Sequence, residues 1–86
     1  MNMMSLQETF KSAIDNNSEY VAVKVSMQGF KECEIIINPK ENFKEKLEYY
    51  MNAYNDNLTL KTFNGIKIID ATHGSMIDID KYFKER

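Results

Sequence analysis

Three residues with side chains suited to hydrolysis lie close together near the C-terminus: Asp70, the only histidine His73, and Ser75. A carboxylate, an imidazole and a hydroxyl form a catalytic triad when the imidazole can take the proton of the hydroxyl. Triad residues usually come from separate segments, whereas these three fall within one connecting segment that has no nucleophile-elbow pattern. We therefore interpret His73 as part of a solvent-facing turn after a strand.

Two further aspartates, Asp78 and Asp80, could join Asp70 and His73 as oxygen and nitrogen ligands of Mg²⁺ or Mn²⁺. On a strand the two aspartates would share a face, whereas on a helix they would diverge. The simpler interpretation is that these carboxylates complement the positive end of a helix dipole. No catalytic residue, metal or cofactor is therefore predicted, and a metal-dependent enzyme using these four residues stays an alternative.

Capping signals and periodicity predict the elements that carry these side chains. Ser5 and Glu8 have the spacing of a capping box, so we expect a first helix to begin at Ser5. The run 15–17, Asp-Asn-Asn, is expected to end it, because Asn tolerates a left-handed backbone. Residues 1–4 are expected to be flexible.

Residues 20–27 alternate between apolar and polar side chains, which predicts a half-buried strand. A second alternating strand is expected over 31–37. A three-residue loop would pair Val25 with Cys33, which aligns the apolar rows of the two strands and leaves Phe30 exposed at the tip. The apolar row of the second strand would comprise Cys33, Ile35 and Ile37.

Asn38 and Pro39 favour the start of a second helix, because Asn caps helices and Pro fits their first turn. Asn42 is an alternative cap one turn later. The helix would carry an apolar stripe within an arc of about 100°, typical of a helix packed on a sheet, with Tyr49 on the opposite, polar side. The stripe comprises Phe43, Leu47, Tyr50, Met51 and Tyr54.

The dipeptide Asn64-Gly65 is a strong signal for a type I′ turn, and it predicts a hairpin in which Phe63 pairs with Ile66. In this register Phe63, Ile66 and Ile68 share one face of the hairpin. The opposite face is also partly apolar, so we expect both faces to be covered.

The C-terminal segment is expected to cover one of those faces. Ser75 and Asp78 can cap a short helix, although alternation through residues 76–80 leaves an edge strand as the alternative. The predicted fold is a single α+β domain over residues 1–86: a four-stranded antiparallel sheet from two hairpins with helices packed on it, in the order αββαββ plus a short C-terminal helix.

Composition excludes several classes of function. The net charge of the 86 residues is −2, and ten Lys against one Arg are interleaved with Glu, as in Lys44-Glu45-Lys46. Nucleic-acid-binding proteins concentrate basic residues on one face and favour Arg, so direct nucleic-acid binding is not expected. No apolar run approaches the roughly 18 residues of a membrane span. A single cysteine and the lack of a signal-peptide pattern favour a cytoplasmic protein.

Several apolar side chains have no evident position in a core. Exposed aromatic residues are favoured in protein interfaces because they bury a large area at a small entropic cost. The sequence therefore predicts a surface for a protein partner or for self-association. It comprises Phe30, Tyr49, Phe63, Ile66 and Ile68.

Five short runs between residues 19 and 70 carry a resemblance to small phage and prophage proteins of low-GC Gram-positive bacteria. The runs are Gly29-Phe30, Ile36-Ile37-Asn38-Pro39, Glu41-Asn42-Phe43, Lys46 to Tyr50, and Leu58 to Ile66. The resemblance implies a phage accessory protein acting in the host cytoplasm, a class that includes inhibitors of host enzymes and of anti-phage defence. It implies no catalytic residues.

The leading hypothesis is a non-enzymatic phage or prophage protein that binds another protein, as a homo-oligomer. The first alternative is an oligomeric sponge for small molecules or nucleotides, in which Tyr and Asn at a subunit boundary bind a base and Lys meets phosphate. The second is the metal-dependent enzyme described above.

Overall fold

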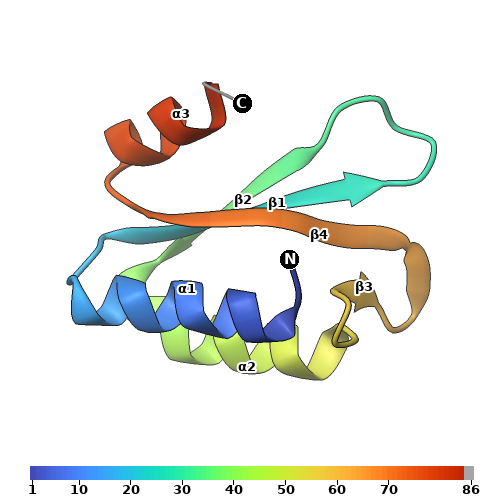
Figure 1. Ribbon diagram of the computed structural model, residues 1–86, viewed down its shortest axis with the longest axis horizontal. Coiled ribbons are helices and arrows are strands. Elements are labelled where there is room, and N and C mark those ends of the chain that lie inside the picture. Colours follow the sequence, from blue (N-terminus) through green and yellow to red (C-terminus); the bar gives the residue numbers. More distant parts are fainter. Residues whose placement is uncertain (85–86) are drawn as a thin grey trace.

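The computed structural model describes residues 1–84, and over these residues the chain forms three α-helices and a four-stranded antiparallel sheet (Figure 1). The strand order β2-β1-β4-β3 joins two hairpins through their longer strands, which confirms the predicted α+β class and the order αββαββ plus a final helix. The elements are α1 (Met3–Asp15), β1 (Tyr20–Met27), β2 (Glu34–Pro39), the 3₁₀-helix η1 (Lys40–Asn42), α2 (Phe43–Ala53), β3 (Thr59–Leu60), β4 (Phe63–Gly74) and α3 (Met76–Lys84).

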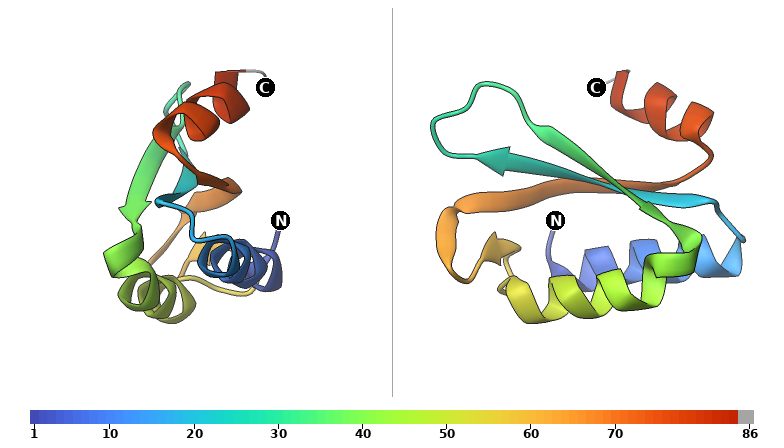
Figure 2. Two further views of the ribbon diagram at one scale, coloured as in Figure 1. Left: turned by 90° about the vertical axis from the view of Figure 1, so that its left-hand side faces the viewer. Right: turned by 180° about the vertical axis from the view of Figure 1, so that it is seen from behind.

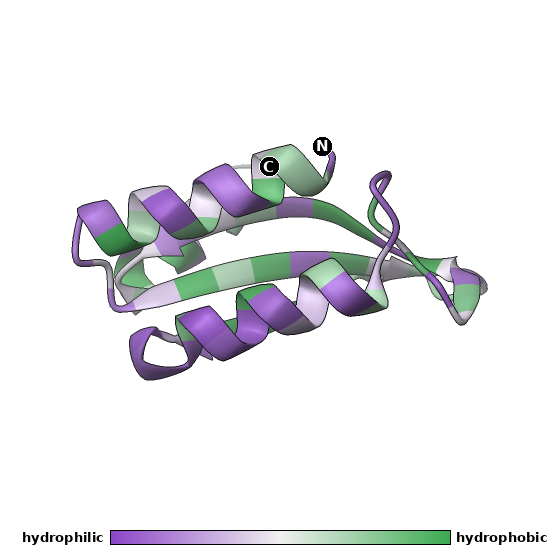
Figure 3. Cartoon of the chain, turned by 90° about the horizontal axis from the view of Figure 1, so that it is seen from below, coloured by the Kyte–Doolittle hydropathy of each residue, from purple (hydrophilic) through white to green (hydrophobic). Residues whose placement is uncertain are grey.

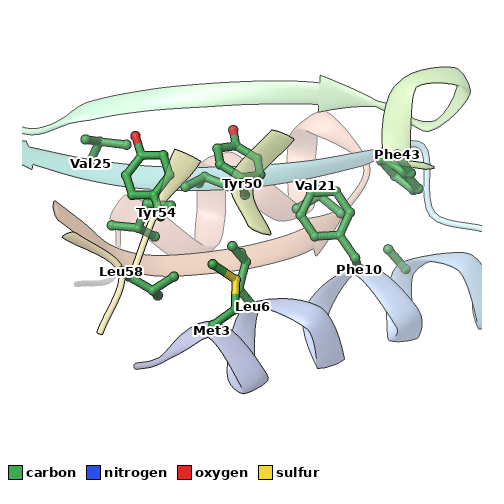
Figure 4. Packing of buried hydrophobic residues seen from close by; sticks show 12 residues of the cluster. Met3, Leu6, Phe10, Val21, Val25, Phe43, Tyr50, Tyr54 and Leu58 are labelled. Atoms are coloured by element: carbon green, nitrogen blue, oxygen red, sulfur yellow. The ribbon is translucent and has the colours of Figure 1, made fainter. Parts of the chain in front are cut away.

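Helices cover both faces of the sheet: α1 and α2 lie side by side on one face, and α3 lies on the other (Figures 1 and 2). The main core fills the layer between the sheet and the helix pair (Figure 4). At its centre the Phe10 ring lies 5.7 Å from the Phe43 ring and 6.1 Å from the Tyr50 ring, centre to centre. The outer surfaces of α1 and α2 are mostly hydrophilic, and the strands behind them are mostly hydrophobic (Figure 3).

The first helix begins two residues earlier than predicted. Asn2 is its cap: the N–H and the hydroxyl of Ser5 both donate to the Asn2 side-chain oxygen, at 2.9 and 3.0 Å. Met3 is buried and its N–H donates to the Asp56 carbonyl, so Met3 and Met4 form the first turn of α1. At the other end Asn17 adopts φ 53°, which confirms the predicted left-handed residue.

The first strand has the predicted bounds, but the second strand and its register differ from the prediction. β2 starts at Glu34, and Val25 lies opposite Glu34 instead of Cys33. This shift of one residue turns Ile36 toward the core and places Ile35 on the opposite face, so the predicted apolar row is wrong. Cys33 lies in the β1–β2 loop as a half-buried free thiol.

The buried amide of Asn38 explains the register. Its nitrogen donates to the Val21 carbonyl at 3.2 Å and to the Tyr50 hydroxyl at 3.3 Å. Buried polar groups need such partners, and the amide and the phenol satisfy each other only when Asn38 faces the core. The prediction that Asn38 caps the second helix is therefore wrong.

The second helix also starts later than predicted. Pro39 ends β2, and η1 connects the strand to α2. Asn42 occupies the cap position, although its side chain makes no capping hydrogen bond. Within the predicted stripe Phe43, Tyr50 and Tyr54 are buried.

The second hairpin does not turn at Asn64-Gly65. Leu60 pairs with Phe63, so the tight turn consists of Lys61 and Thr62, and Asn64-Gly65 lies inside β4. A bulge opposite Lys24 and Val25 then shifts the pairing of β4 with β1 by one residue. Ile66 and Ile68 before the bulge and Ala71 after it therefore all reach the core side.

The predicted C-terminal helix is confirmed as far as Lys84, and the edge-strand alternative is wrong; Glu85 and Arg86 lie outside the described residues. Ser75 caps α3 reciprocally with Asp78: the Ser75 N–H and hydroxyl donate to the carboxylate, and the Asp78 N–H donates to the Ser75 hydroxyl oxygen. Within α3 the side chain of Ile79 is buried. The Nζ of Lys24 in β1 lies 5.9 Å from the centre of the Phe83 ring of α3. Both faces of the sheet are thus covered, as predicted.

Candidate protein-binding surfaces

The three residues considered as a catalytic triad, Asp70, His73 and Ser75, each bind a different partner. The nitrogen Nδ1 of His73 lies 2.8 Å from the hydroxyl of Ser18, in the α1–β1 loop. Asp70 accepts from the Tyr82 hydroxyl at 3.0 Å and from the Ala71 N–H at 2.9 Å, while Ser75 bonds to Asp78. The three residues therefore do not form a hydrolytic site.

The interpretation of His73 as part of an exposed turn is also wrong. His73 lies within β4, half-buried, opposite Val21 of β1. This antiparallel pairing brings the residues just before β1 to the end of β4, which is why Ser18 meets His73 across 55 positions of sequence. No local pattern encodes that contact, and its evident effect is to join the α1–β1 loop to the sheet.

The metal-ligand candidates are also separated. The Ser75 N–H and hydroxyl donate to Asp78 and hold the pKa of its carboxyl below the usual value, while Asp80 forms an ion pair with Lys84 at 3.3 Å. Among residues 1–84 no three His, Cys, Asp or Glu side chains are grouped so that they could hold a metal ion. The four residues of the metal-enzyme alternative are thus not assembled in this part of the chain.

Two of the predicted surface residues lie at the same end of the sheet. Phe30, in the β1–β2 loop, is 69% exposed, and Phe63, at the start of β4, is 50% exposed. The Gln28 N–H donates to the Gly65 carbonyl at 2.8 Å, which holds this loop against β4. A Cβ at Gly65 would lie 2.6 Å from the Phe63 ring, so glycine is needed for the ring to lie over this backbone.

The other three predicted residues lie elsewhere. Tyr49 on α2 is 51% exposed, with its ring 5.4 Å from that of Tyr50. Ile66 is half-buried against the core and Ile68 is fully buried, so the expectation that they form an exposed face is wrong. The bulge in β4 is the reason, because it lets both isoleucines and Ala71 face the same layer.

The surface that sequence reasoning missed is the free edge of β2, since the sheet order places this strand at the edge. The Lys40 N–H donates to the Glu19 carbonyl at 2.9 Å, in the same register as the β1–β2 ladder. Bonded and non-bonded pairs alternate in an antiparallel ladder, so odd-numbered residues of β1 bond to even-numbered residues of β2. The N–H and C=O groups of Ile35 and Ile37 therefore point away from β1.

The side of α2 that bears Tyr49 flanks the same edge. Met51 faces α1, because the Gln7 side chain donates to its sulfur at 3.4 Å. Tyr49 lies about 160° around the helix from Met51 and so faces away from α1. Since α2 lies beneath β2 (Figure 2), Tyr49 faces the side of the open edge. The Lys46 Nζ lies 5.7 Å from the centre of the Tyr49 ring. The β2 edge surface is defined here as Ile35, Ile36 and Ile37 of β2 with Lys46 and Tyr49 of α2.

Comparison with known proteins gives no match to a family model, to a curated protein or to a solved structure. Over residues 1–84, no helix has both the length and the apolar character needed to cross a bilayer.

Proposed function

We propose that this protein is a non-enzymatic protein-binding domain whose β2 edge surface pairs with an extended strand of another chain. A single observation carries the proposal. β2 runs for six residues along β1 without a register shift. The backbone N–H and C=O groups of Ile35 and Ile37 are directed at the open edge, whereas those of Ile36 pair with β1. Addition of a strand to such an edge is a common mode of peptide recognition.

The chemistry of the edge suits this mode. Each added N–H···O bond contributes roughly 0.5–1.5 kcal/mol net, so main-chain pairing gives affinity that depends little on partner sequence. Ile35, 37% exposed, and Tyr49 supply apolar contact on the two sides of the strand.

On the expectation of a phage or prophage origin, we further propose a partner in the bacterial host, such as an enzyme or an anti-phage defence factor. No particular observation favours the nucleotide sponge. The metal-dependent enzyme is disfavoured, because Asp70, His73, Asp78 and Asp80 each bind a different neighbour.

Selection of peptides from a random library, followed by amide hydrogen exchange, tests the proposal. In the free protein at low concentration the Ile35 and Ile37 amides should exchange fast, and the Ile36 and Asn38 amides slowly, because only the latter pair with β1. A bound peptide should slow exchange at Ile35 and Ile37. Selected peptides that leave both amides unprotected would contradict the proposal.

The matched variants are Ile37→Pro and Ile69→Lys. The first removes an N–H that points outward and should abolish peptide binding without breaking the β1–β2 ladder. The second changes an apolar residue on β4, 41% exposed, and should leave peptide binding unchanged.

A further inference from the structure

We propose that the strand occupying the β2 edge is β2 of a second copy of this chain, paired antiparallel about a two-fold axis at Ile36. This inference rests on the binding mode proposed above and names the strand that occupies the edge when no other partner is present. It would join two four-stranded sheets into one continuous sheet with α2 of each copy beneath the junction.

Hydrogen-bonding geometry favours this register over its neighbours. With Ile36 opposite its own copy, Ile35 of each chain faces Ile37 of the other, and all outward N–H and C=O groups of both residues are paired. A shift of one step toward the C-terminus sets Ile35 opposite Pro39, which has no N–H to donate. A shift toward the N-terminus sets the Glu34 side chain beside Ile36 of the other copy, against the apolar layer.

Charge also favours antiparallel pairing of two copies. Two exposed acidic residues, Glu32 and Glu34, precede the three isoleucines of β2, and the exposed Lys40 follows them. Antiparallel pairing places the acidic end of one strand beside the basic end of the other. Parallel pairing would place like charges together, which is unfavourable.

Side chains extend the contact on both faces of the joined sheet. On the α3 side, Ile35 and Ile37 of the two copies form one apolar patch across the axis. On the helix-pair side, Ile36 meets its own copy, and Tyr49 flanks the junction. The interface is small, so we expect a dissociation constant on the order of 100 μM.

Light scattering of the full chain over about 10–500 μM should show the mass rising from the 10.1 kDa of one chain toward twice that value. Ile35→Lys should weaken dimerisation about tenfold or more, because it places a charge beside Ile37 of the other copy. Ile69→Lys is the matched control, since Ile35 and Ile69 are 37% and 41% exposed, and it should leave the dimer unchanged. A monomer at every concentration, or equal weakening by both variants, would overturn the inference.

Oxidative cross-linking tests the register in a Cys33→Ser background. Residues facing each other in a non-hydrogen-bonded pair have Cα atoms about 4.5 Å apart, within the span of a disulfide. Ile36→Cys should therefore form a covalent dimer, whereas Ile35→Cys and Ile37→Cys should not, because each lies opposite the other position. Cross-linking through either outer position instead would overturn the two-fold register.

The two proposals can fail separately. A monomeric protein whose Ile35 and Ile37 amides are protected by a selected peptide would reject the second copy as occupant and retain the proposed function. A dimer that cross-links through none of positions 35, 36 and 37 would reject this edge as the dimer interface, whereas selected peptides that leave both amides unprotected would reject the proposed function.

Discussion

At one edge of the sheet β2 pairs with β1 over six residues without a register shift, whereas at the other edge β3 contributes two residues and β4 is interrupted by a bulge. Beyond β3, the Asp70 carboxylate accepts from the N–H of Ala71, a group that would otherwise point outward. Short strands, bulges and charged side chains are the features by which proteins prevent edge-to-edge association. Only the second edge has all three, so we interpret the exposure of β2 as functional.

The anchors of the two edges also differ in chemistry. β3 follows Leu58, a fully buried residue with a left-handed backbone at φ 66°. β2 is held by the buried amide of Asn38 and the hydroxyl of Tyr50. Substitution of Leu58 therefore tests the apolar packing at the closed edge, and substitution of Asn38 tests the side-chain hydrogen bonds at the open edge.

The largest effect is expected at the closed edge. Leu58→Ala should lower the free energy of unfolding by about 2–5 kcal/mol, because it removes a buried side chain and leaves a cavity. Chemical denaturation would measure this loss. Leu58→Gly is the control for backbone strain: glycine adopts the left-handed conformation freely, so it should be no less stable than Leu58→Ala. A loss below 1 kcal/mol would show that Leu58 does not anchor this edge.

A smaller effect is expected at the open edge. Asn38→Leu should lower the free energy of unfolding by about 2 kcal/mol, because the buried Tyr50 hydroxyl loses its partner and the strand loses its bond to Val21. Denaturation combined with amide exchange at Ile36 would measure stability and pairing together. A variant as stable as the wild type, with Ile36 still protected, would contradict the role of Asn38 in setting the register.

Removing a protective feature should make the two edges more alike. Asp70→Ala frees the outward N–H of Ala71, so we expect new concentration-dependent association that Ile35→Lys does not suppress. Light scattering of the double variant would measure it. Tyr82→Phe is the control, because it removes the hydroxyl bonded to Asp70 and leaves the carboxylate in place. Association equal to that of the wild type would show that Asp70 does not protect this edge.

The smallest effect concerns alkaline pH. Burial raises the pKa of Tyr50 above its ordinary value of 10.0, so the stability that its neutral hydroxyl contributes is complete below pH 10 and is lost as the pH rises through the folded-state pKa. Tyr50→Phe should be about 1 kcal/mol less stable than the wild type near neutral pH. In thermal unfolding, the difference should shrink as the pH rises above 10 and through the folded-state pKa. A difference that stays constant across this range would contradict a buried, hydrogen-bonded phenol.

Local signals were sufficient for part of the fold. The bounds of β1, the left-handed Asn17 and the reciprocal cap of Ser75 and Asp78 each follow from signals within a few residues, and each prediction is confirmed. The exposure of Phe30, Tyr49 and Phe63 was also predicted, because each falls at a tip, a polar helix side or a hairpin end.

Predictions failed where distant groups compete for the same residue. Asn38 has the sequence of a helix cap, yet its amide binds Tyr50 twelve positions away, which shifts β2 by one residue. Asn64-Gly65 has the sequence of a turn, yet the pairing of β4 with β1 extends through it and moves the turn to Lys61 and Thr62. Ile68 became a core residue through a bulge whose position depends on β1.

The amino-acid sequence by itself determined the number and order of the α-helices and strands, because capping and periodicity act over one or two helical turns or along one strand. Only the tertiary structure decided the strand order, the register of β2 and therefore which backbone groups point outward. Those choices depend on burying Asn38 with Tyr50 and on joining the hairpins through β1 and β4, and such contacts exist only when all the elements are assembled.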